Sequence, residues 1–181
     1  MAPTQEIIQV EMTLASLGGI PEHPLPPGFR FRWFRPGDQE TWTDIWRRCE
    51  KFLKLTPATF AQEFGTDEQV LALRQLFLLD SEGKAVGTST AWLADEAHGP
   101  HCGRIHWVAI VPEMQGRGLA KPLLSTCLQR MRELGYRSAV LGTQTPRLAA
   151  IKLYLDFGFV PDMSVPDADR AWRLVREHLQ L

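Results

Sequence analysis

A short glycine-containing segment, residues 115–121, holds the residue types whose spacing best suits chemistry. It reads Gln-Gly-Arg-Gly-Leu-Ala-Lys, between an apolar run at 105–111 and a segment, 121–134, with apolar residues at helical spacing. A strand, a glycine turn and a helix in this order point backbone N–H groups and the positive end of the helix dipole at one spot. A diphosphate is the natural ligand there, and Gly116 and Gly118 let it approach the backbone because they have no Cβ.

Two familiar phosphate-binding loops do not fit this segment. Lys121 is followed by proline and not by the serine or threonine of a P-loop. The third glycine of the dinucleotide-binding turn is also missing. What remains is Q-x-x-G-x-A after a strand that ends in Pro-Glu. It resembles the acyl-CoA pyrophosphate loop of the GNAT superfamily of N-acyltransferases, whose pattern is Q/R-x-x-G-x-G/A.

The resemblance continues in residues 146–159, which are similar to the family pattern N-x-x-A-I-x-L-Y-x-x-x-G-F. The matching residues are Ala150, Ile151, Leu153, Tyr154, Gly158 and Phe159. Together the two motifs cover residues 105–159, and by them the chain is identified as a member of this superfamily. The resemblance implies that acetyl-CoA, or a close analogue, is the co-substrate.

The resemblance also implies the fold, a single α/β (α+β) domain. Its mixed, mostly antiparallel sheet would have about six or seven strands, splayed at the middle and flanked by about four helices. In that fold the backbone of the fourth strand holds the pantetheine arm, here at Val108, Ala109 and Ile110. The loop residues that would hold the pyrophosphate are Gln115, Gly116, Arg117, Gly118, Leu119, Ala120 and Lys121. Lys121 either adds a cation near the phosphates or is a solvated helix residue.

Acyl transfer to an amine needs a deprotonated amine, a polarised carbonyl oxygen and a proton for the departing thiolate. Tyr154 occupies the position from which the family's tyrosine approaches the departing sulfur, so the resemblance implies that it is the acid. The alternative is that Tyr154 packs beside Phe157 and that its hydroxyl bonds elsewhere.

The general base is less evident. Residues 139–145, where related enzymes often carry a glutamate, contain no carboxylate. We expect His106 to serve, because histidine accepts a proton near neutral pH and the period of a strand puts it on the face of Val108. The alternatives are a structural role for His106, a base at His101 or Glu113, and a chain of water molecules.

Three further side chains bear on the ligands. Arg147 replaces the asparagine that the family has at the start of its second helix, and we expect it at the cofactor, with an acidic substrate or bulk solvent as alternatives. Trp42 and Trp46 are four residues apart on a predicted helix. They are expected either in the core or as an aromatic wall of the acceptor site.

Residues 1–28 are expected to be an N-terminal extension, a tail or short helix followed by a proline-rich linker. Residues 29–181 would form the acyltransferase domain, with Asp38 as the N-cap of its first helix. Strands are predicted at 29–34, 75–79, 85–93, 104–111, 138–141, 159–163 and 171–175. Helices are predicted after residues 38, 56 and 66, and at 121–134 and 146–159.

The composition limits which classes of binding partner are expected. The chain has 181 residues, 44% hydrophobic and 23% charged, as in one ordinary globular domain. A net charge of −1 gives no reason to expect nucleic acid, and no apolar run approaches the roughly 20 residues of a membrane helix. No secretory signal is visible, so we expect a cytoplasmic protein without a membrane partner. A homodimer is left open, because such folds often dimerise. The residues His98, His101, Cys102 and His106 match no metal-site spacing, so no metal is predicted.

The sequence therefore predicts an N-acetyltransferase in which a primary amine of a small-molecule or peptide acceptor attacks acetyl-CoA directly in a ternary complex. An alternative from another class is a non-catalytic acyl-CoA-binding or interaction module, supported by the missing carboxylate near Gly142 and by Arg147. A hydroxyl or thiol acceptor is the third alternative.

Overall fold

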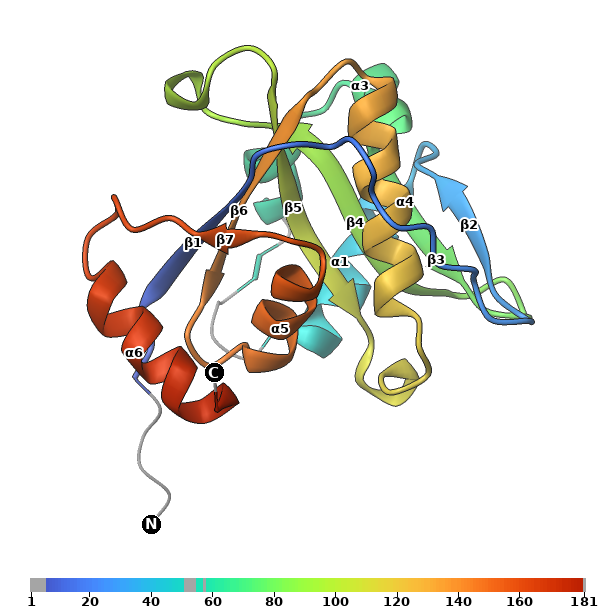
Figure 1. Cartoon of the computed structure of the whole chain (residues 1–181). Helices are drawn as coiled ribbons and strands as arrows, with labels where there is room; N and C mark the ends of the chain where they lie inside the picture. The colour runs from blue at the N-terminus through green and yellow to red at the C-terminus, as the bar shows by residue number, and fades with distance from the viewer. Residues whose placement is uncertain (1–5, 51–54, 57, 181) are drawn as a thin grey trace.

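The computed structural model describes residues 6–50, 55–56 and 58–180, which form one α/β domain around a seven-stranded sheet (Figure 1). The strands lie in the order β2-β3-β4-β5-β6-β1-β7. Their bounds are β1 (Gln9–Leu14), β2 (Arg30–Trp33), β3 (Gln75–Leu79), β4 (Ala85–Leu93), β5 (Cys102–Ile110), β6 (Ser138–Gln144) and β7 (Val160–Pro161). The helices of the described residues are α1 (Asp38–Cys49), α2 (Thr59–Phe64), α3 (Glu68–Arg74), α4 (Ala120–Glu133), α5 (Leu148–Asp156) and α6 (Ala168–Leu179).

The sheet is mixed, as the family resemblance implied. Neighbouring strands are antiparallel except β5 and β6, which run parallel. The β5–β6 register holds for three residue pairs, from Cys102↔Ser138 to Arg104↔Val140. Beyond Arg104 the two strands are no longer paired, and this is the expected splay at the middle of the sheet.

Apolar cores lie on both faces of the sheet. Every residue of β3 is buried, because helices cover it from both sides; Figure 1 shows α4 in front of the central strands and α1 behind them. One core cluster joins β1 to α4, α5 and α6, and the other joins α1, α2 and α3 to β2, β3 and β4. None of the helices in the described ranges is long and apolar enough to cross a lipid bilayer.

The N-terminal block differs from the prediction. Residues 9–14 are neither a tail nor a short helix but strand β1, which pairs with β6 through six residues and with β7 through two. Val10, Met12 and Leu14 alternate into the core, so burial of one face fixes this strand in the sheet. The proline-rich residues that follow have no helix or strand, as expected, yet they pack on the domain. Figure 1 shows them crossing α4, where the hydroxyl of Ser125 donates to the carbonyl of Pro21 at 2.7 Å.

The C-terminal segment also differs. Residues 171–175 were predicted as a strand but lie inside α6. The buried residues of this helix are Ala168, Ala171, Trp172 and Val175, and their spacing of three, one and three is the period of an amphipathic helix. A window of five residues is too short to show that period. With α6, the described helices number six and not about four.

Several local predictions are confirmed. Strands β3 and β4 have the predicted bounds, and α2 buries Phe60 and Phe64 as expected. The predicted N-cap is wrong: Gly37, with a φ of 94°, precedes α1, and Asp38 is its first helical residue. The reason is that the Asp38 carboxylate is occupied by other donors.

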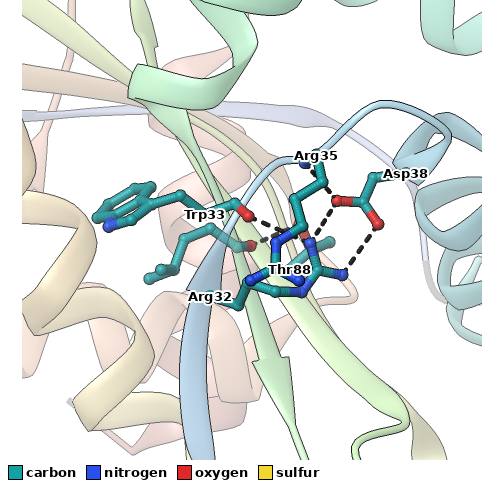
Figure 2. A network of polar contacts seen from close by, with 6 residues as sticks. Arg32, Trp33, Arg35, Asp38 and Thr88 are labelled. Atoms are coloured by element: carbon teal, nitrogen blue, oxygen red, sulfur yellow. Dashed lines mark hydrogen bonds and ion pairs between the residues drawn. The ribbon is translucent and has the colours of Figure 1, made fainter.

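Asp38 ties β2 to the start of α1 (Figure 2). Its carboxylate accepts two hydrogen bonds from the Arg32 guanidinium, at 2.6 and 2.9 Å, and one from the backbone N–H of Arg35 at 2.6 Å. The side chains are 8% exposed for Asp38 and 19% for Arg32. Because two parallel charge-assisted bonds fix both groups, the pair sets the angle at which the chain enters α1.

Replacing Asp38 should destabilise the protein. In Asp38→Ala the largely buried Arg32 loses its counter-charge, so we expect a loss of about 3 kcal/mol in the free energy of unfolding. Asp44→Ala is the control, because Asp44 is 78% exposed and its pair with Arg47 is worth under about 0.5 kcal/mol. Urea unfolding of both variants checks this, and equal midpoints would show that the Arg32–Asp38 pair contributes little.

Candidate functional site

A cavity of about 300 Å³ opens where β5 and β6 separate. Strands β5, β6 and β1 form its walls, together with α2, α5 and the C-terminal end of α1. Its described polar and aromatic lining includes Glu11, Trp46, Glu50, Glu63, Arg104, His106, Trp107, Arg147 and Tyr154. Early loss of strand pairing therefore gives this fold a cleft with both charged and aromatic walls.

A β-bulge at Trp107 shapes the β5 wall. Thr88 of β4 pairs with Ala109 and Thr90 pairs with His106, so two residues of β5 stand opposite one residue of β4. Trp107 has a φ of 52°, which is uncommon for a bulky residue, and a bulge withdraws the extra residue from the ladder. The bulge interrupts the expected strict alternation, yet His106 and Val108 both line the cavity.

Glu63 of α2 holds this bulge. Its carboxylate oxygen Oε2 accepts a hydrogen bond from the Trp107 indole at 2.8 Å and lies 3.0 Å from His106 Nε2. The hydrogen bond from His106 lowers the pKa of Glu63 and outweighs the opposing effect of partial burial, and the Trp107 bond lowers it further. The site thus contains an ionised carboxylate paired with the histidine that the sequence singled out.

Tyr154 is almost fully buried, at 6% exposure, and it lines the cavity from α5. Its ring packs edge-on against Phe159, with centroids 5.9 Å apart. Burial raises the pKa of Tyr154 to about 12. The phenol therefore keeps its proton at neutral pH and is a hydrogen-bond donor.

The glycine loop has the predicted conformation. Gly116 and Gly118 have φ values of 76° and 75°, and a Cβ added to either would meet no atom within 4 Å. Gln115 Nε2 donates to the carbonyl of Ile110 at 2.8 Å, which fastens the loop to the end of β5. Leu119 is buried and anchors the start of α4. The open space above two left-handed glycines fits the approach of phosphates to the backbone.

Two of the three cations of the predicted cofactor site, Lys121 and Arg147, have carboxylate partners. Lys121 Nζ lies 3.3 Å from an oxygen of Asp156, and Arg147 Nη2 lies 2.7 Å from Glu50 Oε2. The Glu50 side chain is 1% exposed and that of Arg147 is 26% exposed. Arg147 therefore faces the cavity from an ion pair and does not lie in bulk solvent. Arg117 is exposed on the loop.

Of the remaining residues that the sequence suggested for the site, some lie at the cavity and others do not. Neither His101 nor Glu113 is among the described residues that line the cavity, and Glu113 instead pairs with Arg48. Trp42 is fully buried against Phe60, Phe64 and Trp107, so it belongs to the core. Trp46 is also buried but reaches the cavity wall. Within the described ranges, no three His, Cys, Asp or Glu side chains are grouped as a metal site.

Three carboxylates from the described residues line the cavity, Glu11, Glu50 and Glu63, and the sequence analysis identified none of them. The family resemblance pointed instead to residues 139–145, where related enzymes often carry a glutamate. The structure brings Glu11 to the same place from the neighbouring strand, directly opposite Gly142. The absence of a carboxylate on β6 supported the alternative of a non-catalytic module. The site nevertheless contains a carboxylate at this position, that of Glu11.

Comparison with known proteins agrees with this geometry. The sequence profile of the Acetyltransferase (GNAT) family matches residues 32–159. The chain belongs to the GNAT acetyltransferase family. The family assignment that the two motifs in residues 105–159 implied is thus confirmed.

Relatives within the family are named for acetyl transfer. The chain is 30% identical over 181 residues to a protein of Pseudarthrobacter chlorophenolicus named mycothiol acetyltransferase, covering 91% of this chain and 52% of the relative. It is 30% identical over 133 residues to N-acetyltransferase 8B of Rattus norvegicus, covering 71% and 54%. The chain spans about half the length of these curated relatives.

Solved structures share the fold. A GCN5-related N-acetyltransferase from Sphaerobacter thermophilus superposes with a TM-score of 0.71 at 22% identity, covering 85% of this chain and 48% of that one. The ribosomal-protein-S18-alanine N-acetyltransferase from Escherichia coli gives a TM-score of 0.60 at 21% identity, covering 73% and 77%. The predicted fold class is therefore confirmed.

The Glu63 carboxylate should contribute to stability only above the pH at which it is protonated. Because its pKa is lower in the folded protein than the ordinary 4.5, its contribution is present above that pH and is lost as the pH falls through the lower folded value. Glu63→Gln should therefore unfold more easily than the unsubstituted protein at pH 7, and the difference should shrink below about pH 4.5. The side chain is 34% exposed, so we expect no more than about 1 kcal/mol.

Chemical denaturation at several pH values measures this, with Glu82→Gln in the exposed β3–β4 turn as the control. A stability difference that stays constant down to pH 3 would mean that the Glu63 charge has no role in holding the bulge.

Proposed function

We propose that the protein transfers the acetyl group of acetyl-CoA to a primary amine by direct attack within a ternary complex. The observation that carries this proposal is one cavity that holds a His106–Glu63 pair on one wall and the buried phenol of Tyr154 on another. The His106–Glu63 pair is suited to remove a proton from the acceptor, and the Tyr154 phenol is suited to donate a proton to the leaving thiolate. The names of the relatives support acetyl as the acyl group and an amine as the acceptor.

Acetyl-CoA would lie along β5 and reach the loop before α4. Backbone groups of Val108, Ala109 and Ile110 would hold the pantetheine arm, although Gln115 already occupies the Ile110 carbonyl. Backbone N–H groups of residues 115–121 would bind the pyrophosphate, since the start of α4 presents N–H groups that have no helical partner. Arg117 and Lys121 would add positive charge, and Arg147 would contact the cofactor from the opposite wall.

His106 would act as the general base. If Nε2–H donates to Glu63, Nδ1 carries the lone pair that accepts a proton from the acceptor's ammonium group. The Glu63 carboxylate fixes this tautomer and stabilises the imidazolium that forms. Glu63 is then a positioning residue, and His106 is the group that touches the acceptor.

In the proposed reaction, protons move among the acceptor, His106, Tyr154 and solvent. The freed amine nitrogen attacks the thioester carbonyl carbon, whose oxygen is polarised by backbone N–H of β5 next to the bulge. The carbon–sulfur bond breaks as the carbon–nitrogen bond is completed, and the thiolate takes the phenolic proton of Tyr154. The nitrogen loses its second proton, which restores the phenol, and the imidazolium of His106 releases the first proton to solvent. The products are the N-acetylated acceptor and coenzyme A. Holding both substrates in one cleft removes the bimolecular entropy cost.

Blocking the glycine loop should abolish cofactor binding. In Gly118→Glu the new side chain fills the open space over the loop and its charge repels a diphosphate, so affinity for acetyl-CoA should fall by at least about 100-fold. Gly99→Glu is the matched control, because Gly99 also has a positive φ and equally open surroundings, and it precedes β5 whereas the glycine loop follows it.

Calorimetric titration with acetyl-CoA measures both variants. Loss of binding in Gly118→Glu alone is the expected result. Equal affinities, or no binding by the unsubstituted protein, would overturn the assignment of the loop.

Removing the acid should slow catalysis without weakening cofactor binding. Tyr154→Phe keeps the ring and its contact with Phe159 but has no proton to donate. We expect kcat to fall by about 100-fold at an unchanged KM for acetyl-CoA. Tyr136→Phe is the control, because Tyr136 bonds to Arg74 outside the cavity. Thiol release with a panel of primary amines measures both, and an unchanged kcat in Tyr154→Phe would exclude Tyr154 as the acid.

A further inference from the structure

Glu11 lies at a position that only a glycine neighbour allows. It stands directly opposite Gly142 in the β1–β6 ladder, and a Cβ built on Gly142 would come within 2.7 Å of Glu11 Oε1. The carboxylate therefore lies over the backbone of residue 142, at the cavity wall. Any larger residue at 142 would displace it.

The neighbours of Glu11 compensate its charge incompletely. Arg104 Nη1 lies 3.6 Å from Glu11 Oε2, while its other nitrogen donates to Asp95 at 2.9 Å. One guanidinium is thus shared by two carboxylates and is nearer to Asp95. Burial, the largest effect, raises the pKa of Glu11, and Arg104 and His98 lower it without reversing this direction. A bound cation would compensate the remaining negative charge of the Glu11 carboxylate.

The other two carboxylates of the cavity have closer partners. Glu50 and Arg147 are 2.7 Å apart, and Glu63 is bonded to both His106 and Trp107. Among the described carboxylates of the cavity wall, Glu11 is therefore the one best able to accept a new cationic partner.

Glu11 and the base His106 stand on opposite walls at the same level. The last β5–β6 pair is Arg104↔Val140; His106 lies two residues beyond it on β5, and Gly142 lies two residues beyond it on β6. Because the strands are parallel, equal steps bring both residues to the same height of the cleft. A ligand at this level can reach His106 with one end and Glu11 with the other.

We propose that Glu11 binds a second, non-reacting cationic group of the acceptor, so that the preferred acceptors are primary amines with an additional ammonium or guanidinium group. This specificity rests on the proposed function. It assigns the N-terminal strand a part in acceptor recognition, because β1 supplies the carboxylate and Gly142 supplies the space for it.

Two linear acceptors of matched length test this, 1,5-diaminopentane and 5-amino-1-pentanol, in which a hydroxyl replaces the second ammonium. The unsubstituted protein should acetylate the diamine with a kcat/KM at least about tenfold higher than that for the amino alcohol. In Glu11→Gln this preference should disappear. Glu82→Gln, on a distant turn, should retain it.

Gly142→Ala tests the geometry separately, because it displaces the carboxylate without removing it. It should abolish the preference as Glu11→Gln does, and the Glu11→Ala/Gly142→Ala double variant should lose no more than Glu11→Ala alone. If Gly142→Ala fails to fold, the Glu11→Gln result decides alone.

Binding separates this inference from the proposed function. Each amine is titrated by calorimetry into the protein saturated with coenzyme A. If the diamine binds more tightly and Glu11→Gln loses this preference, the cation site at Glu11 is supported. If neither amine is acetylated, only the proposed amine acetylation is overturned. Equal binding and equal turnover of the two amines, or a preference that survives in Glu11→Gln, would overturn the role of Glu11.

Discussion

The parallel pairing of β5 and β6 stops after three residue pairs, and the cavity exists because of this early end. A gap in a sheet is costly when it strands backbone N–H and C=O groups. Here each strand has another partner: β4 continues along β5 to Ile110, and β1 pairs with β6 through Gln144. Each half of the sheet therefore keeps one paired edge beyond the last β5–β6 pair, and the cleft between the halves remains open.

The N-terminal strand β1 supplies the pairing partner for β6 and β7. Without β1, strand β6 would be an exposed edge, and the two-residue strand β7 would have no neighbour in the described sheet. Burial of Val10, Met12 and Leu14 fixes the register of β1, because a shift by one residue would turn all three toward the opposite face. The same register brings Glu11 opposite Gly142, so packing on one face of β1 determines the chemistry on the other.

What the sequence predicted well is local. The glycine loop, the α5 motif and strands β3 and β4 each depend on residues close together in the chain, and their turn chemistry and periodicity are visible there. The features it missed are contacts between distant residues. Glu63 meets His106 across 43 positions, and β1 pairs with a strand about 130 positions away. Glu11 and Glu63 carry no motif, since a carboxylate on a short strand or helix looks the same whether it faces solvent or a cavity. The helix α6 was missed for a different reason, because the five residues 171–175 form a window too short to reveal helical periodicity, which needs roughly 11 residues or more.

The environments of two cavity side chains favour opposite protonation states. Glu63 receives two hydrogen bonds, so its pKa falls and it stays an anion beside His106. Tyr154 is buried among apolar side chains, so its pKa rises and it stays a neutral donor. Groups whose pKa values are displaced in opposite directions within one site are those that can hold opposite protonation states at one pH. The bulge at Trp107 contributes to this separation, because the indole that fixes the strained backbone also bonds the Glu63 carboxylate. The geometry of β5 and the ionised state of Glu63 therefore depend on the same side chain.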